Sequence, residues 1–172
     1  MNLTSQRLPG GHLFFSLLLS LLVTAGCGFH LKESAQLPAS FGPVSVEGVS
    51  NSSDLYRSIR NILKGSGIKI VDPDSANNRI SVRITRNDRK VLSVDTGGKV
   101  SEYELLREIR FSVRNAAGTD IIDEQTISVT RYYDVNDSDA ALNDSLEEAD
   151  LRRIMDEELA DRMFRYIAAQ AG

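Results

Sequence analysis

The sequence is poor in the residues that perform redox, metal and nucleophilic chemistry. Of its 172 residues, one is cysteine, two are histidine and none is tryptophan. A lone cysteine, Cys27, cannot form a disulfide within the chain, so packing alone has to hold the fold together. Ser-His-Asp and Cys-His catalysis need a positioned imidazole, and a His/Cys zinc site needs several ligands. With only His12 and His30 present, the sequence predicts no enzyme of these classes, no metal site and no cofactor.

The residues before Cys27 predict an export signal. Arg7 precedes an apolar run at residues 13–23, and Ala25 and Gly26 lie directly before the cysteine, which is the order of a signal peptide. The eleven residues of the run are too few to span a membrane, which takes ~20. A cysteine in this place resembles a bacterial lipobox, in which a diacylglycerol is attached to Cys27 and the chain is cut before it. The alternative is a plain secretory signal with an incidental cysteine.

Lipid attachment at Cys27 would anchor the chain without spanning the membrane. Each buried methylene contributes ~0.8 kcal/mol, so several acyl chains hold a protein almost permanently. Gly28 stands where an aspartate would favour retention in the inner membrane, so the expected location is the cell outer membrane, with the domain on the periplasmic side. The expected organisation is a lipoprotein signal peptide at residues 1–26, a lipid-anchored tether at 27–43 that includes His30, and a single domain at 44–172.

The charge balance excludes nucleic acid as a partner. Without residues 1–26, which hold Arg7 and no acidic residue, 19 basic residues face 24 acidic ones, for a net charge of −5. A nucleic-acid-binding domain would show a net basic face.

The order of apolar and polar residues predicts strands and two helices. Period-two alternation indicates half-buried strands, and apolar residues three or four apart indicate one helical face. A helix is expected between Ser52 or Ser53 and the glycines Gly65 and Gly67, and a second is expected to begin at a capping box of Ser145 and Glu148. The expected strands are residues 44–49, 80–84, 103–113 with a bulge at Leu106 and Arg107, and 121–133.

Each expected helix has one apolar stripe, and the expected sheet has one apolar face. The predicted fold class is therefore α+β: a two-layer sandwich of an about four-stranded, mostly antiparallel sheet with two helices packed on one face. The stripe of the last helix has Ile154 beside it and consists of Leu151, Met155, Leu159, Met163 and Ile167.

A basic cluster is the best candidate for an anion-binding surface. The alternatives are a solvated strand edge, and ion pairs with Glu104 and Glu108 of a neighbouring strand; the sequence does not separate them. The cluster consists of Arg79, Arg83, Arg86, Arg89 and Lys90.

Two groups of acidic residues are candidates for a calcium site and a catalytic carboxylate pair. The acidic segment that starts at Asp134 fails as a calcium loop, because Asp139 stands where glycine is needed and Ser145 where a bidentate glutamate is needed. Its later acids are expected to favour the N-terminus of the last helix. Glu104 and Glu108 have the form of a carboxylate pair for glycoside hydrolysis, but on an open sheet face they are expected to be solvated.

Three strings together resemble the LptE family of lipopolysaccharide-assembly lipoproteins. They are Cys27–Lys32, Ser101–Leu105 after a glycine loop, and Thr130–Asp134 before a long last helix, and the resemblance covers residues 27 to 170. It implies the same sandwich fold and a role as a plug in the LptD β-barrel, which assists barrel assembly and lipopolysaccharide delivery to the outer leaflet. It also implies lipopolysaccharide contacts on basic loop residues, for which this chain offers Lys99. The alternative function is a free-standing outer-membrane lipoprotein that binds a periplasmic protein partner.

Overall fold

The computed structural model describes residues 37–135 and 140–171. The expected signal peptide, Cys27, His30 and most of the expected tether lie outside these residues. Among the described residues, no helix has the length and apolar character needed to cross a membrane. The elements are η1 (Ala39–Phe41), β1 (Val44–Glu47), α2 (Asp54–Gly65), η2 (Pro73–Ser75), β2 (Asn78–Val94), β3 (Val100–Asn115), β4 (Asp120–Asp134) and α3 (Ala140–Ala171).

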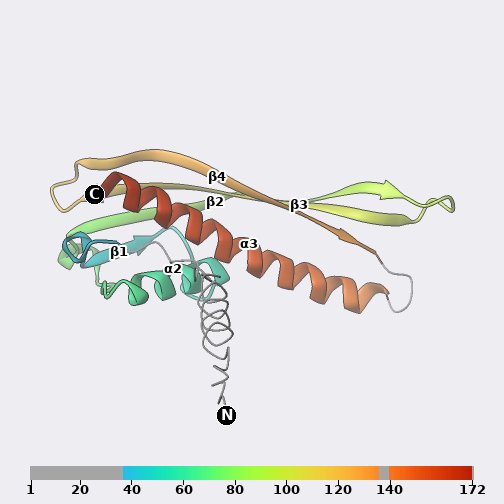
Figure 1. The fold of residues 1–172 in the computed structure, drawn as a ribbon, viewed down its shortest axis with the longest axis horizontal. Helices are drawn as coiled ribbons and strands as arrows, with labels where there is room; N and C mark the ends of the chain where they lie inside the picture. The colour runs from blue at the N-terminus through green and yellow to red at the C-terminus, as the bar shows by residue number, and fades with distance from the viewer. Residues whose placement is uncertain (1–36, 136–139, 172) are drawn as a thin grey trace, which may run out of the picture. The chain divides into compact units, whose positions relative to one another are not determined.

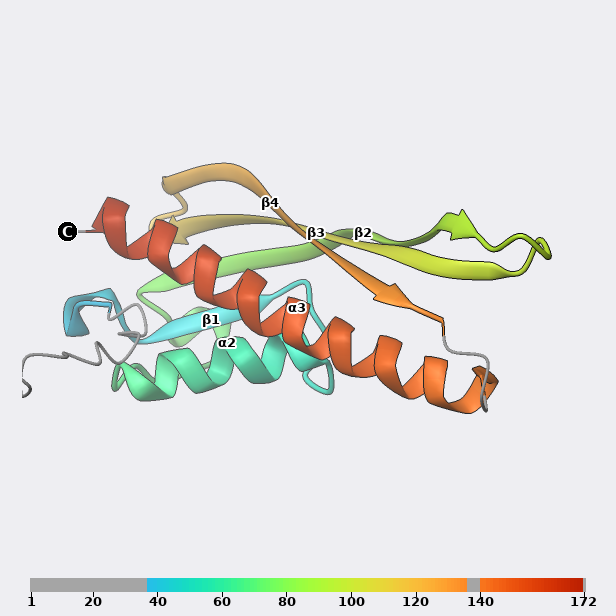
Figure 2. The same ribbon diagram turned by 45° about the vertical axis from the view of Figure 1, so that its right-hand side comes forward.

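The strands form one sheet, and both helices lie on the same face of it (Figures 1 and 2). The strand order is β1-β2-β3-β4; β1 runs parallel to β2, and the other neighbours are antiparallel. The predicted α+β sandwich is confirmed. β1 is followed directly by Gly48, where φ is 87° and an added Cβ would lie 2.3 Å from the Val82 carbonyl oxygen. Only glycine allows this approach between the two strands.

The hairpin of β2 and β3 is longer than the sequence predicted. β2 runs for 17 residues, and the part beyond Ile84 is mostly exposed, so it lacks the apolar alternation that marks a half-buried strand. The bulge predicted at Leu106 and Arg107 is wrong, because β3 alternates without interruption from Leu105 to Val113 and Arg107 points inward. The irregularity lies on the neighbouring strand, where Thr85 is the extra residue between two register pairs.

Helix α2 begins and ends where the sequence predicted. The Ser53 hydroxyl oxygen accepts a hydrogen bond from the Tyr56 N–H at 3.2 Å, which caps the first turn. The helix ends at Gly65, and Gly67 takes a φ of 72° as the chain turns back. The predicted start of the last helix is wrong, since α3 begins at Ala140 and Ser145 lies inside it.

The core lies between α3, α2 and the covered face of the sheet. Met155, Leu159, Met163 and Ile167 are completely buried, as the stripe predicted, whereas Ile154 is 39% exposed and does not belong to the core. The structure adds Ala160 and Phe164 of α3, which pack in the same cluster as Leu55, Ile59 and Leu63 of α2.

The core also includes residues from the range expected to be a tether. Leu37 and Phe41 are buried, and the Asn78 side-chain amide donates to the Phe41 carbonyl at 2.7 Å. The packed domain therefore includes residues before the expected boundary at 44. The sequence signal was weak because, within residues 37–43, Leu37 and Phe41 are the two residues that are buried.

We predict that Leu159→Ala lowers the free energy of unfolding by about 2–5 kcal/mol, since it removes a fully buried side chain and leaves a cavity. The matched control is Ile154→Ala on the same helix, where the side chain is partly exposed and the cost should stay near ~0.5 kcal/mol. Urea unfolding followed by circular dichroism measures both values. Equal costs for the two variants would contradict the position of α3 given above.

Candidate functional site

Two of the strings that resemble the LptE family lie side by side in the sheet. Ser101–Leu105 belongs to β3 and Thr130–Asp134 to β4, and the register pairs Tyr103 with Tyr133 and Leu105 with Arg131. Both strings are at the end of the sheet where β2 and β3 are joined by the turn at residues 95–99 (Figure 1). We call residues 85–107 the distal arm. The two strings, which are far apart in the sequence, therefore lie in the same region of the structure.

An aromatic and ionic cluster occupies this place. The Tyr103 and Tyr133 rings stack with centroids 5.4 Å apart, and the Arg89 guanidinium carbon lies 4.5 Å from the Tyr103 centroid. Arg89 also donates to a Glu148 carboxylate oxygen at 2.8 Å, and Arg152 donates to the other oxygen at 2.7 Å. The cluster therefore connects β2, β3, β4 and α3.

The charges of this cluster are fixed by their surroundings. Burial alone would raise the pKa of Glu148, but hydrogen bonds and charges from Arg152 and Arg89 outweigh it and lower that pKa below its usual value. Burial raises the pKa of the Tyr133 hydroxyl. Tyr133 therefore stays neutral at physiological pH and donates to Glu148 at 3.3 Å. Glu148 is the common acceptor of the cluster.

A buried ion pair lies beside the cluster, and sequence reasoning missed it. Arg107 of β3 donates through Nε and Nη2 to the two carboxylate oxygens of Asp156 on α3, at 2.5 and 2.9 Å. The two residues are only 8% and 2% exposed. Burial raises the pKa of Asp156, and hydrogen bonds from Arg107 and the Leu55 backbone N–H offset part of that rise. Arg107 also donates to the Asn87 side-chain oxygen at 2.7 Å.

The predicted anion-binding arginines are ion-paired in the structure. Arg79 lies 3.0 Å from Glu47, and Arg83 lies 2.6 Å from Glu124. Arg89 binds Glu148 as described above. These partners differ from the Glu104 and Glu108 that the alternative interpretation offered, because the register places the arginines opposite other residues.

The remaining predicted contacts lie on the distal arm. Arg86 pairs with Asp88 at 2.7 Å, and Lys90 stands opposite Glu104 in the register. The backbone N–H of Lys99 donates to the Asp95 carboxylate at 2.9 Å, within the turn that ends the arm. Glu108 accepts from the Thr85 hydroxyl at 2.7 Å. Over residues 37–135 and 140–171, no group of His, Cys, Asp and Glu has the arrangement of a metal site.

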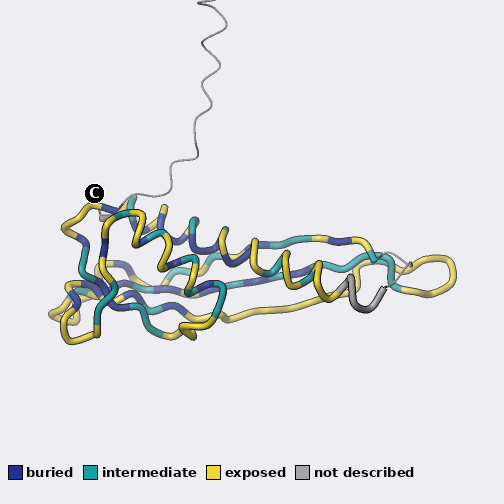
Figure 3. Tube along the Cα trace, turned by 90° about the horizontal axis from the view of Figure 1, so that it is seen from below, coloured by how far each residue is buried: buried dark blue, intermediate teal, exposed yellow. Residues whose placement is uncertain are grey.

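Many residues around the same end of the sheet are exposed (Figure 3), and several of them are apolar. Val94, next to the turn, is 57% exposed, and Tyr132, in the second string, is 56% exposed. Val91 and Leu92 of the arm and Leu146 of α3 are exposed as well. Exposed apolar groups that gather in one region mark a surface for another protein or a membrane. Neither the arm nor this surface followed from the sequence, because its apolar residues face outward.

Comparison with known proteins agrees with these features. The family model LptE, described as lipopolysaccharide-assembly, matches residues 41–167. The LPS-assembly lipoprotein LptE of Pectobacterium atrosepticum is 32% identical over 159 residues, which cover 90% of this chain and 84% of that protein. The protein of the same name from Photorhabdus laumondii is 30% identical, and the match covers 91% of this chain and 86% of that protein.

Solved structures share the fold. The rare lipoprotein B of Shewanella oneidensis superposes with a TM-score of 0.63 at 28% identity, over 73% of this chain and 93% of that one. A lipoprotein B of Nitrosomonas europaea is similar in fold, with a TM-score of 0.65 at 21% identity. The superposition covers 83% of this chain and 91% of that one. The family model covers the sheet, α2 and most of α3, including the cluster of Tyr103, Tyr133 and Glu148. The chain belongs to the LptE family.

Proposed function

We propose that this chain is an outer-membrane lipoprotein that plugs an LptD-type β-barrel and helps to assemble it, for delivery of lipopolysaccharide to the outer leaflet. Family membership supports the role in lipopolysaccharide assembly, and relatives at about 30% identity are named as lipoproteins of that process. Membership in this family also means that the chain is not an enzyme, as the shortage of histidine and cysteine predicted.

The exposed apolar surface at the distal arm carries the proposal of a protein partner. Val91, Leu92 and Val94 belong to the part of β2 after Val82, which has no buried residue, so burial against another protein explains their character. The face of the sheet that the helices leave uncovered carries ion-paired arginines; Arg83, for example, pairs with Glu124. A polar face of this kind suits the polar interior of a large barrel. The domain then sits within the barrel lumen, or below it on the periplasmic side.

The finer assignments complete the proposal. Cys27 is the lipid attachment site, residues 1–26 are the signal peptide, and one LptE-like domain follows. We assign direct contact with lipopolysaccharide phosphates to Lys90 and Lys99, because both cations lie on the distal arm. Arg79 and Arg83 are less suited to this contact because they lie outside the distal arm, and Arg89 is less suited because it is part of the Glu148 cluster.

Lipid attachment is tested by Cys27→Ala. Metabolic labelling with an alkyne-bearing fatty acid should mark the native chain and leave the variant unlabelled, since the variant lacks the sulfur that accepts the diacylglycerol. Labelling of the variant at the native level would contradict the assignment and favour a plain secretory signal.

Barrel binding is tested by Val94→Asp at the distal arm. A carboxylate there would be buried without a partner in the complex, so we expect co-purification of an LptD-type barrel from detergent-extracted membranes to fall at least about tenfold, a loss of ~1.4 kcal/mol. The matched control is Ile121→Asp, another exposed strand residue outside the arm, which should retain the barrel.

A tagged native chain that brings down no large barrel at native expression would refute the proposal and favour the free-standing lipoprotein. Equal retention by Val94→Asp and the native chain would place the contact surface elsewhere. Depletion of the chain should reduce assembled barrel and surface lipopolysaccharide together, whereas a role in lipopolysaccharide binding alone leaves barrel assembly normal.

A further inference from the structure

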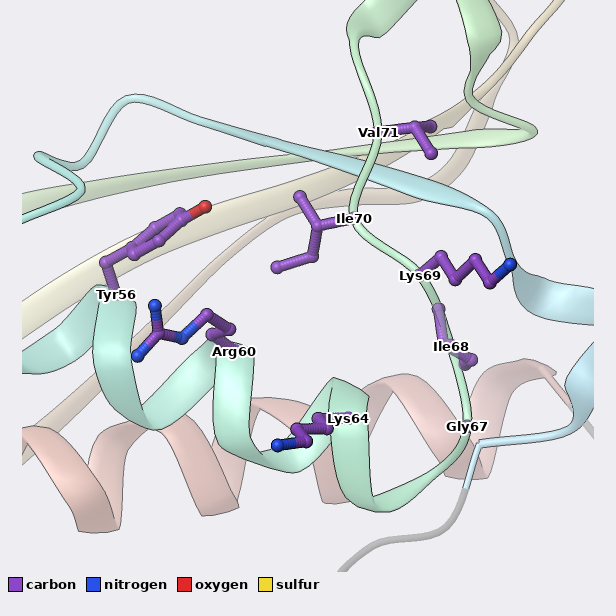
Figure 4. A pocket seen from close by; sticks show the side chains of 8 residues that line it. All are labelled: Tyr56, Arg60, Lys64, Gly67, Ile68, Lys69, Ile70 and Val71. Atoms are coloured by element: carbon purple, nitrogen blue, oxygen red, sulfur yellow. The ribbon is translucent and has the colours of Figure 1, made fainter.

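Two cations of α2, Arg60 and Lys64, share one groove and have no acidic partner among the described residues. Among the residues that the structure describes, every arginine except Arg60 lies within 4.0 Å of a carboxylate oxygen. Arg60, Lys64 and Lys69 have no such ion pair there. Arg60 and Lys64 lie on the α2 side of one groove, and Lys69 belongs to its other wall with its ammonium pointing away from α2 (Figure 4). Because the other described arginines are neutralised by carboxylates, the groove keeps a positive charge. This charge suits an anionic ligand from outside the chain.

The groove lies between α2 and the chain that follows it (Figure 4). Tyr56, Arg60 and Lys64 are four residues apart and so share one face of α2. Residues 67–71 form the opposite wall, and the Ile70 side chain points across toward α2. The groove has a volume of about 620 Å³. It therefore combines a row of cations with an apolar wall.

The opposite wall also offers a backbone donor. Val44 donates its N–H to the Lys69 carbonyl at 3.0 Å, and Val71 donates to the Val44 carbonyl at 2.9 Å. In a parallel pair, bonds to one neighbour come from alternate residues, so the N–H of Ile70 faces away from β1. Within residues 37–135 and 140–171, that N–H has no backbone acceptor.

The groove lies close to where the chain enters the fold. The Leu37 N–H donates to the Ser66 hydroxyl at 3.5 Å, and Ser66 directly precedes the groove residue Gly67. Cys27 is ten residues before Leu37, a separation of at most ~35 Å. An acyl anchor at Cys27 would hold this groove within reach of the headgroups of its own leaflet. This step rests on the proposed lipid attachment.

We propose that the groove binds the phosphate headgroup of an anionic phospholipid of the phosphatidylglycerol type. Arg60 and Lys64 compensate the phosphate charge, and Ile70 and Tyr56 contact the first methylenes of an acyl chain. Cationic groups near a lipid anchor strengthen membrane attachment by attracting anionic lipids. The groove is separate from the distal arm, so it can act together with the barrel contact.

The test measures how well each lysine of the full chain, purified in neutral detergent, is protected from an amine-acetylating reagent, with mass spectrometry as the readout. Soluble dihexanoyl phosphatidylglycerol, at about four times its dissociation constant, should slow the modification of Lys64 about fivefold by mass action. Lys90 on the distal arm, which is assigned to lipopolysaccharide, is the comparison site and should be protected less than Lys64. Because the lipid is added in solution, the result depends neither on Cys27 nor on the barrel.

Two variants locate the effect. Arg60→Gln should abolish the protection of Lys64, whereas Arg57→Gln, one turn earlier on α2 and paired with Asp54, should leave it unchanged. Equal protection by dihexanoyl phosphatidylcholine or by inorganic phosphate would overturn the proposal, as would protection of Lys90 to the same extent. Protection by lipopolysaccharide but not by phosphatidylglycerol would also overturn it.

Discussion

The buried carboxylate of Asp156 is the point on which the arrangement of the helices and the sheet depends. It projects from α3 and accepts from Nε and Nη2 of Arg107 on β3, and the Leu55 backbone N–H in the first turn of α2 helps to lower its pKa. A buried charge is costly unless it is fully hydrogen-bonded, so the three elements have to keep one relative position. The first turn of α2 also offers unpaired N–H groups and the positive end of its dipole.

This contact divides α3 into two halves that pack by different means. From Met155 onward the helix packs through completely buried apolar side chains such as Leu159 and Met163. Before that point Glu148 and Arg152, eight and four residues ahead of Asp156, bind the arm through Arg89 and Asn87. Because ionic contacts hold the distal half, its apolar side chains remain available to a partner. The proposed barrel contact follows from this division.

Sequence reasoning identified the parts whose side chains alternate between core and solvent. Val113 and Ile109 of β3 and the stripe of α3 are such parts, and their placement is confirmed. It failed where a polar residue faces inward or an apolar one faces outward. The inward-facing Arg107 broke the apolar alternation and was interpreted as a bulge, and the outward-facing Val94 fitted neither a strand nor a helix pattern. Arg89 was recognised as a candidate, but its partner Glu148 is 59 residues away, a pairing that no local pattern contains.

The most direct test of this account is a double-mutant cycle at the buried pair. The free energy of unfolding is measured at pH 7 for Arg107→Leu, Asp156→Leu and the combined variant. Each single change leaves a buried charge without its partner and should cost about 3–5 kcal/mol, whereas the combined change removes both charges and should cost less than either. A combined cost equal to the sum of the single costs would show that the two residues act independently, and would contradict the account.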